Sequence, residues 1–200
     1  MFFPWQAGYH FDMIKSAAES PGWKTGFAAT QIHRVERLIK LSRELTGDHF
    51  KLGHEEALRV PYEIRTLEKL TDSEIHESGV LADIARYQYT EPRFGRKRDL
   101  YRVNLQDHNI LAMLRRRPRE LNFSPLLLYV LTHEIIHVIR FVKFLAPFHQ
   151  DLGDHLPEER MVHAQTRGIL SHVPLRGMNT VLDHYEKHYA SPSQASAKEG

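Results

Sequence analysis

Apolar residues are densest between Ser124 and Phe144, where they occupy nearly every side of a helical projection. Ser124 is a favourable N-cap residue, and Pro125 suits the first turn of a helix. Neither glycine nor proline interrupts the chain again before Pro147. Because a helix that is apolar all round is buried, this pattern predicts one long core helix over about residues 126–145.

The clearest strand pattern in the chain follows a basic loop at residues 92–98. Residues of two sets alternate there, with Leu100, Arg102 and Asn104 in one set and Tyr101, Val103 and Leu105 in the other. A period of two residues is typical of a half-buried β-strand. A strand is therefore predicted over Tyr101–Leu105.

The remaining chain shows mainly helical patterns. Apolar residues recur with helical spacing over residues 27–45, which predicts an amphipathic helix that Gly47 ends. Other helices are predicted over residues 11–20, 54–60, 62–70, 77–89 and 156–170, and a last one ends at residues 183–189. The end of the 77–89 segment, from Tyr87 to Thr90, is alternatively extended.

These patterns predict a single domain of the α+β class that is mostly helical. Residues 1–98 are expected to form a helical N-terminal region, within the same fold or as a subdomain. Residues 99–190 are expected to hold a short sheet packed against the buried helix. Residues 191–200 are small and polar, and a disordered tail is expected there.

The composition, with 42% hydrophobic and 26% charged residues, is ordinary for a soluble globular protein. The net charge of +2 does not favour nucleic acid as a partner. The densest basic run, Arg115–Arg119, contains Pro118 and is expected to be a solvated helix end. The chain has no cysteine, which excludes disulfides, thiolate metal ligands and cysteine nucleophiles.

The start of the chain lacks the basic and apolar regions of a signal peptide. The longest apolar run, residues 126–145, contains His, Glu, Arg and Lys, so no membrane span is expected. We therefore expect a cytoplasmic protein.

Within the predicted core helix lies the sequence His133-Glu134-Ile135-Ile136-His137, an H-E-x-x-H motif. Residues i and i+4 of a helix lie on one face, so the two imidazoles can bind one metal ion. Glu134 is placed to accept the proton of a water molecule at that ion. The alternative is a pair of core histidines hydrogen-bonded to neighbours, with Glu134 in an ion pair.

The motif, its helix and its apolar flanks resemble the zincin metallopeptidases, over roughly Tyr101 to Leu170. The resemblance implies a Zn²⁺ cofactor bound by His133 and His137. It also implies Glu134 as the general base and a peptide or protein as the substrate. In zincins an edge strand before the motif helix pairs with extended substrate, and the strand Tyr101–Leu105 would take that place.

The sequence offers several candidates for the third ligand. The metzincin extension of the motif fails, because Arg140 and Lys143 stand where that pattern needs Gly and His. The thermolysin-like (gluzincin) pattern instead uses a Glu on a later helix. The helix predicted over residues 156–170 contains Glu158 and Glu159. Glu159 is preferred, because it shares a face with His163 four residues on, and Glu158 is the alternative. Other candidate nitrogen ligands are His149, His155 and His163.

The predicted function is that of a zinc-dependent hydrolase, most simply a peptidase. Residues considered for stabilising the developing oxyanion are His163, His172, His184 and Tyr185, of which His172 is preferred. One alternative is a metal-binding interaction domain without catalysis. Another is a di-iron helical bundle, since Glu134-x-x-His137 is also the unit that such bundles use, although no second E-x-x-H unit occurs.

Overall fold

A computed structural model describes residues 4–10, 25–77, 79–91, 95–146, 148 and 156–189. The predicted helix over 11–20 and the tail over 191–200 lie outside these residues. The elements in chain order are β1 (Pro4–His10), α1 (Ala29–His49), α2 (His54–Arg59), β2 (Tyr62–Arg65), the 3-10 turns η1 (Leu67–Lys69) and η2 (Asp72–Glu74), β3 (Ala82–Thr90), β4 (Lys97–Leu105), α3 (Asp107–Arg116), α4 (Phe123–Val142), α5 (Leu156–Leu170) and α6 (Met178–Tyr189). The α+β class is confirmed.

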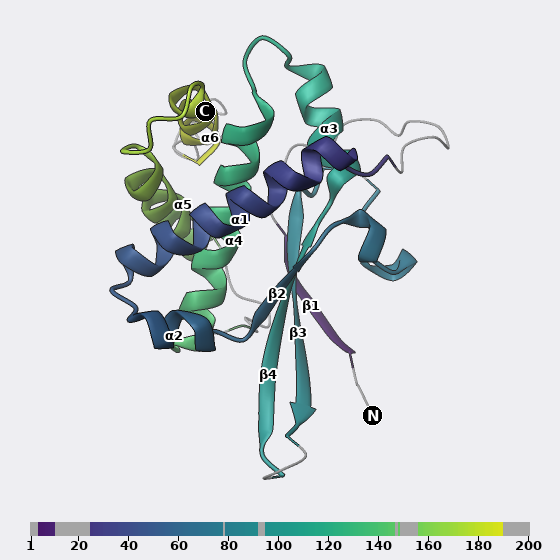
Figure 1. The fold of residues 1–200 in the computed structure, drawn as a ribbon, viewed down its shortest axis with the longest axis vertical. Helices are drawn as coiled ribbons and strands as arrows, with labels where there is room; N and C mark the ends of the chain where they lie inside the picture. The colour runs from purple at the N-terminus through teal and green to yellow at the C-terminus, as the bar shows by residue number, and fades with distance from the viewer. Residues whose placement is uncertain are drawn as a thin grey trace, which may run out of the picture.

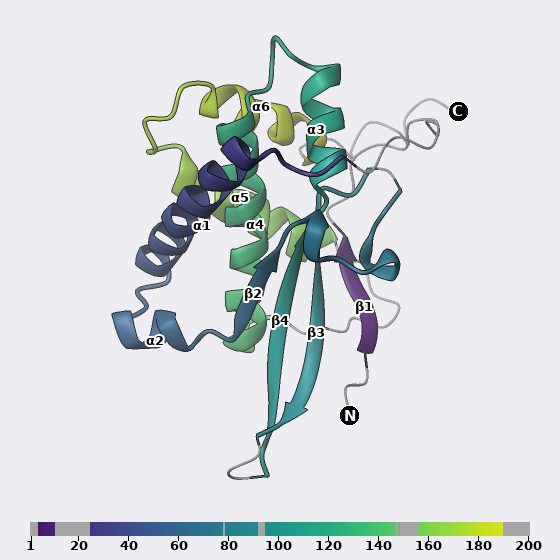
Figure 2. The same ribbon diagram turned by 45° about the vertical axis from the view of Figure 1, so that its right-hand side comes forward.

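The four strands form one sheet in the order β1-β3-β4-β2. Strands β3 and β4 form a long antiparallel hairpin, paired from Ala82 with Leu105 to Thr90 with Lys97. Strand β1 pairs antiparallel with β3, and β2 pairs parallel with β4. The helices α1, α4, α5 and α6 gather on one side of this sheet, while the end of the β3–β4 hairpin extends beyond them (Figures 1 and 2).

The two faces of β4 differ as its alternating pattern requires. Tyr101, Val103 and Leu105 are buried in the core, and the Tyr101 ring stacks on Phe141 of α4 with 5.9 Å between centroids. On the opposite face, Arg102 donates hydrogen bonds to carboxylates of neighbouring segments. An antiparallel pair with one face on the core shows this alternation.

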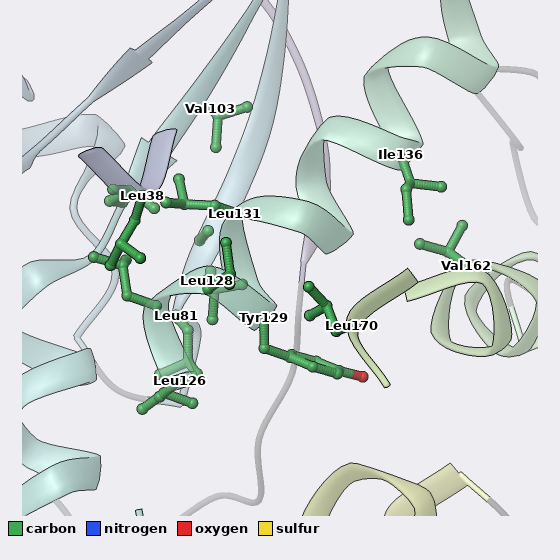
Figure 3. Packing of buried hydrophobic residues seen from close by; sticks show 14 of the residues in the cluster. Leu38, Leu81, Val103, Leu126, Leu128, Tyr129, Leu131, Ile136, Val162 and Leu170 are labelled. Carbon is green, nitrogen blue, oxygen red and sulfur yellow. The ribbon is translucent and has the colours of Figure 1, made fainter. Parts of the chain in front are cut away.

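Helix α4 is the centre of the core. Its apolar side chains lie between the sheet and the other helices, and Figure 3 shows Leu131 near Val103 and Ile136 near Val162. It is the one described helix long and apolar enough to cross a membrane, and 94% of that stretch is buried inside the fold. This burial is typical of a core helix and agrees with the all-round apolar pattern.

The C-terminal end of α4 turns the chain sharply. Phe144 has a left-handed backbone with φ of 54°, and the amide of Leu145 donates to the carbonyl of Arg140 at 2.8 Å. This bond is the Schellman pattern that ends many helices, usually with glycine at the left-handed position. The path of the chain beyond this turn leads to α5, which packs on α4.

Two predicted helices are wrong. The segments 62–70 and 77–89 contain β2 and most of β3, with short 3-10 turns between them. Tyr and Ile recur in both segments and favour strands, and pairing with β4 on its two sides decides the outcome. Three of the four strands thus come from residues 1–98, which contribute to the same sheet as β4.

The expected edge strand is also wrong. Strand β4 begins at Lys97 and has partners on both sides, so its main chain is already hydrogen-bonded within the sheet. The edges of the described sheet are β1 and β2. Residues 101–105 are therefore not placed to pair with an extended substrate.

Candidate metal centre

The two motif histidines project together from α4. One helical turn separates them, and the Nε2 atoms of His133 and His137 lie 3.1 Å apart. Each residue is 1% exposed. The long apolar helix thus carries both imidazoles into the interior, where their polar atoms need partners.

Glu159 in the first turn of α5 joins this pair. Its carboxylate oxygens lie 3.4 Å from Nε2 of His133 and 3.1 Å from Nε2 of His137. These three residues are a group whose ligand atoms all lie within 4.8 Å of one another. Glu159, 22 positions after His137 in the sequence, therefore places a carboxylate at the motif, as the preferred sequence interpretation requires.

The separations in this group suit a small tetrahedral ion. Zinc–ligand distances of about 2.0–2.1 Å place the ligand atoms of a tetrahedral site roughly 3.3 Å apart. The two Nε2 atoms are 3.1 Å apart, which is close to that value, and each has one oxygen of Glu159 at a similar distance: Oε2 is 3.4 Å from His133 and Oε1 is 3.1 Å from His137. Two imidazoles and one carboxylate are also a ligand set of catalytic zinc sites, so the residues present fit this metal.

Glu158, the alternative third ligand, faces elsewhere. Its carboxylate accepts two hydrogen bonds from Arg140, at 2.6 Å from Nε and 2.8 Å from the terminal nitrogen. Both side chains are buried. One carboxylate oxygen of Glu158 lies 4.0 Å from Nδ1 of His137, on the side of that ring away from Glu159. Adjacent helical residues point about 100° apart, which explains why only one of the two glutamates joins the group.

The burial of the site sets the protonation of its ligands. Burial lowers the pKa of His133 to about 4, so this imidazole is neutral at pH 7. Burial alone would raise the pKa of Glu159, but hydrogen bonds from His133 and His137 outweigh it and hold that pKa well below its usual range. A neutral imidazole and an ionised carboxylate are the forms that bind a metal ion.

The burial of the Glu134 carboxyl is energetically unfavourable. It is 2% exposed, and among the described residues no donor reaches its buried Oε1 atom. Burial raises the pKa of this carboxyl well above its usual range, and the charges of Glu159 and Asp83 raise it further. A carboxyl with a raised pKa beside a ligand cluster is suited to accept a proton.

His163, one turn after Glu159, stands beside the cluster. Its ring centroid is 4.6 Å from that of His133, and its Nδ1 shares a short hydrogen bond with the hydroxyl of Tyr129. Burial lowers the pKa of His163 to about 2, and the neighbouring His133 lowers it further. The imidazole is therefore neutral, and Tyr129 determines how it is oriented.

Of the other candidates, Tyr185 on α6 stacks on His163 with 6.0 Å between ring centroids. His172 is exposed in the turn after α5, beyond Leu170, which is itself about 16 Å along the helix axis from Glu159. His184 on α6 is hydrogen-bonded to Arg117 at 3.1 Å. His149 and His155 lie outside the described residues.

Sequence reasoning missed two residues of this site. Tyr129 precedes His133 by four residues, so the helical spacing that links the histidines also places it on the same face. Arg140 follows His137 by three residues and is the only basic residue inside the apolar stretch of α4. A buried arginine requires a carboxylate partner, so Arg140 within the apolar helix could have predicted that Glu158 pairs with it.

Comparison of the chain with protein-family models, with curated proteins and with solved structures gives no match. The geometry of the site is therefore the basis for proposing a function.

Proposed function

We propose that this protein is a zinc-dependent hydrolase of zincin type that acts on peptides. The observation that carries the proposal is the convergence of His133, His137 and Glu159 at 3.1–3.4 Å, with the carboxyl of Glu134 beside them. A pair of core histidines with ordinary partners needs neither the third ligand nor a buried, proton-accepting carboxyl.

His133, His137 and Glu159 would hold the zinc ion, which would supply a Lewis acid for polarising a carbonyl group and acidifying water. Glu134 accepts the proton of the attacking water and passes it to the leaving amine. The burial that raises the pKa of Glu134 strengthens this carboxylate as a base. Glu158 lies on the Nδ1 side of His137, where its carboxylate, oriented by Arg140, is 4.0 Å from that nitrogen and places a negative charge beside the ring.

His163 is the residue best placed to stabilise the developing oxyanion, in place of His172. When the Tyr129 hydroxyl donates to Nδ1, the proton of the neutral imidazole is on Nε2. A neutral imidazole with a fixed N–H is a hydrogen-bond donor that needs no reorganisation during the reaction. His163 also lies next to His133, whereas His172 is at the far end of α5.

The deep burial of the motif also supports a second candidate, a metal-binding domain without catalysis. His133, Glu134 and His137 are each at most 2% exposed. A structural metal site is closed in this way, whereas a catalytic site keeps a coordination position open. A di-iron centre has weaker support, because among the described residues this is the one group of potential ligands.

The test measures metal content and peptide cleavage on the same preparations. Protein purified without added metal is analysed by mass spectrometry for zinc and iron, and incubated with a peptide library whose products are sequenced. The variants are Glu134→Gln and, as control, Glu44→Gln, an exposed residue of α1.

We expect one zinc per chain in all three proteins, with cleavage by the wild type and the control but not by Glu134→Gln. Zinc in all three without cleavage supports the non-catalytic domain. Cleavage by Glu134→Gln at the wild-type rate, or the absence of bound zinc, contradicts the proposal.

A further inference from the structure

Positive charge is concentrated at the end of the molecule where α3 ends and where the chain turns from α5 into α6 (Figure 2). Residues 108–123 and 171–177, called the arginine cap below, contain five arginines and one acidic residue, Glu120. The net charge of the cap is therefore +4, whereas that of the whole chain is +2. The arginines are Arg115, Arg116, Arg117, Arg119 and Arg176.

Direct contacts hold the two segments of the cap together. Gly177 has a φ of 91°, and a Cβ atom placed on it would lie 2.7 Å from Nδ2 of Asn122. The turn before α6 therefore lies against the loop that follows α3. Arg117 donates a hydrogen bond to Nδ1 of His184 on α6 at 3.1 Å and forms an ion pair with Glu120 at 3.4 Å. Arg117 thus fixes this loop to α6.

The other four arginines of the cap are exposed, and none of them forms an ion pair with a residue that the structure describes. Arg115 and Arg116 are in the last turn of α3, where positive charge suits the helix dipole. Arg119 and Arg176 lie outside the helices, so the dipole does not explain them. Four unpaired positive charges at one end of the molecule repel one another and attract a polyanion.

The residue types of the cap favour the phosphates of a nucleic-acid duplex. Every cation is arginine, and a guanidinium group forms two parallel hydrogen bonds to one phosphate. A membrane surface would also require apolar side chains that insert between lipids, and unpaired bases would require aromatic rings for stacking. The large apolar side chains that are exposed among the described residues lie outside the cap: Tyr89, Phe144, Leu145, Leu156 and Met161.

We propose that the arginine cap binds the phosphate backbone of double-stranded nucleic acid without reading the base sequence. Contacts to phosphate position a protein on a duplex but carry no sequence information, and the cap offers arginines for such contacts. This inference goes beyond the proposed hydrolase function and does not depend on it, because the cap contains no residue of the candidate metal centre.

The test measures binding to a fluorescent DNA duplex of about 20 base pairs by anisotropy, between about 50 and 200 mM salt. The cap variant combines Arg116→Gln, Arg119→Gln and Arg176→Gln. The control removes the same number of charges from the exposed end of the β3–β4 hairpin and combines Arg96→Gln, Lys97→Gln and Arg98→Gln. Circular dichroism first verifies that all proteins are folded.

We expect the logarithm of the wild-type association constant to fall with the logarithm of salt concentration with a slope of about −3.6, because four arginines neutralise four phosphates. The cap variant should have a slope of about −0.9 and bind at least roughly tenfold more weakly at about 50 mM salt, whereas the control should resemble the wild type. If the cap variant does not fold, Arg119→Gln with Arg176→Gln takes its place, with an expected slope of about −1.8.

The proposal is overturned if the wild type does not bind the duplex, or if the cap variant keeps the wild-type slope. An equal loss in the control overturns it as well, because the effect would then come from overall charge. Tighter binding to single-stranded oligothymidine than to the duplex contradicts recognition of a duplex. Binding to vesicles of phosphatidylcholine and phosphatidylserine, without binding to the duplex, would assign the cap to a membrane surface instead.

Discussion

The buried pair of Arg140 and Glu158 offers the sharpest test of how this site is built. Replacing Arg140 by Met keeps an unbranched side chain of similar reach but removes both hydrogen bonds to the carboxylate, at 2.6 and 2.8 Å. The side chains of Arg140 and Glu158 are 7% and 9% exposed, so little water can replace the lost donors. The variant leaves an uncompensated buried charge next to His137.

The magnitude follows from that burial. Removing one partner of a buried ion pair costs about 3–5 kcal/mol. For a chain of this length, each kcal/mol lowers the Tm by about 2–4 °C, so the expected decrease is about 6–20 °C. Replacing both residues by Met removes the stranded charge and should recover most of this stability. Zinc affinity should fall by about 10–100-fold in the single variant, because Arg140 no longer orients the Glu158 carboxylate beside His137.

The assay combines thermal unfolding of metal-free protein, monitored by circular dichroism, with zinc titration against a chromophoric chelator. Arg37→Met, at an exposed position of α1, is the matched control. The reasoning is refuted if Arg140→Met is no less stable than Arg37→Met. It is also refuted if the double variant is as unstable as the single one, since the cost would then not come from the stranded carboxylate.

Three further predictions concern other parts of the molecule. In a zinc titration, the affinity of Glu158→Gln should decrease by about 10–100-fold, and that of Glu159→Ala should decrease more. The reverse order would make Glu158 the ligand. Burial raises the pKa of Asp107 to about 6 against hydrogen bonds from the amides of Phe27 and Leu67. The protonated Asp107 carboxyl therefore adds up to about 3 kcal/mol to the free energy of unfolding below about pH 4. This contribution is lost as the pH rises through about 6. Urea unfolding at pH 4 and pH 7 should show that the free energy of unfolding decreases less between these pH values in Asp107→Asn than in the wild type. An equal decrease in both proteins would contradict the raised pKa of Asp107. Gly168→Ala should raise the free energy of unfolding by about 0.5–1 kcal/mol, because Gly168 is helical and its Cβ position is open; a decrease would show that the position is not free.

Local features of the chain were predictable because their causes lie within a short window. The core helix, the helix over residues 156–170 and the period-two strand before them each follow from spacing that the backbone geometry imposes on apolar residues. The pairing of His133 with His137 has the same origin, since i and i+4 always share a helical face. Nothing outside the motif is needed to bring these two imidazoles together.

Strand pairing depended on residues far apart in the chain. Segments 62–70 and 77–89 contain the strands β2 and β3 because β4 offers hydrogen-bonding partners on both sides, and strand propensity depends on such context. For the same reason β4 became an interior strand. A short stretch of sequence does not contain the strand with which it pairs. Helical periodicity within these two segments therefore predicted helices where the chain forms strands.

The chemical groups of the motif and their spacing along α4 follow directly from the sequence. Which distant groups meet them depends on how the helices pack in the folded chain. The orientation of α5 about its own axis, where it packs on α4, directs Glu159 to the histidines and Glu158 to Arg140. It also places His163, and not His172, beside the site. The physical reason is that neighbouring residues on a helix differ in direction by about 100°, and the packing of side chains across the interface selects which of them faces inward.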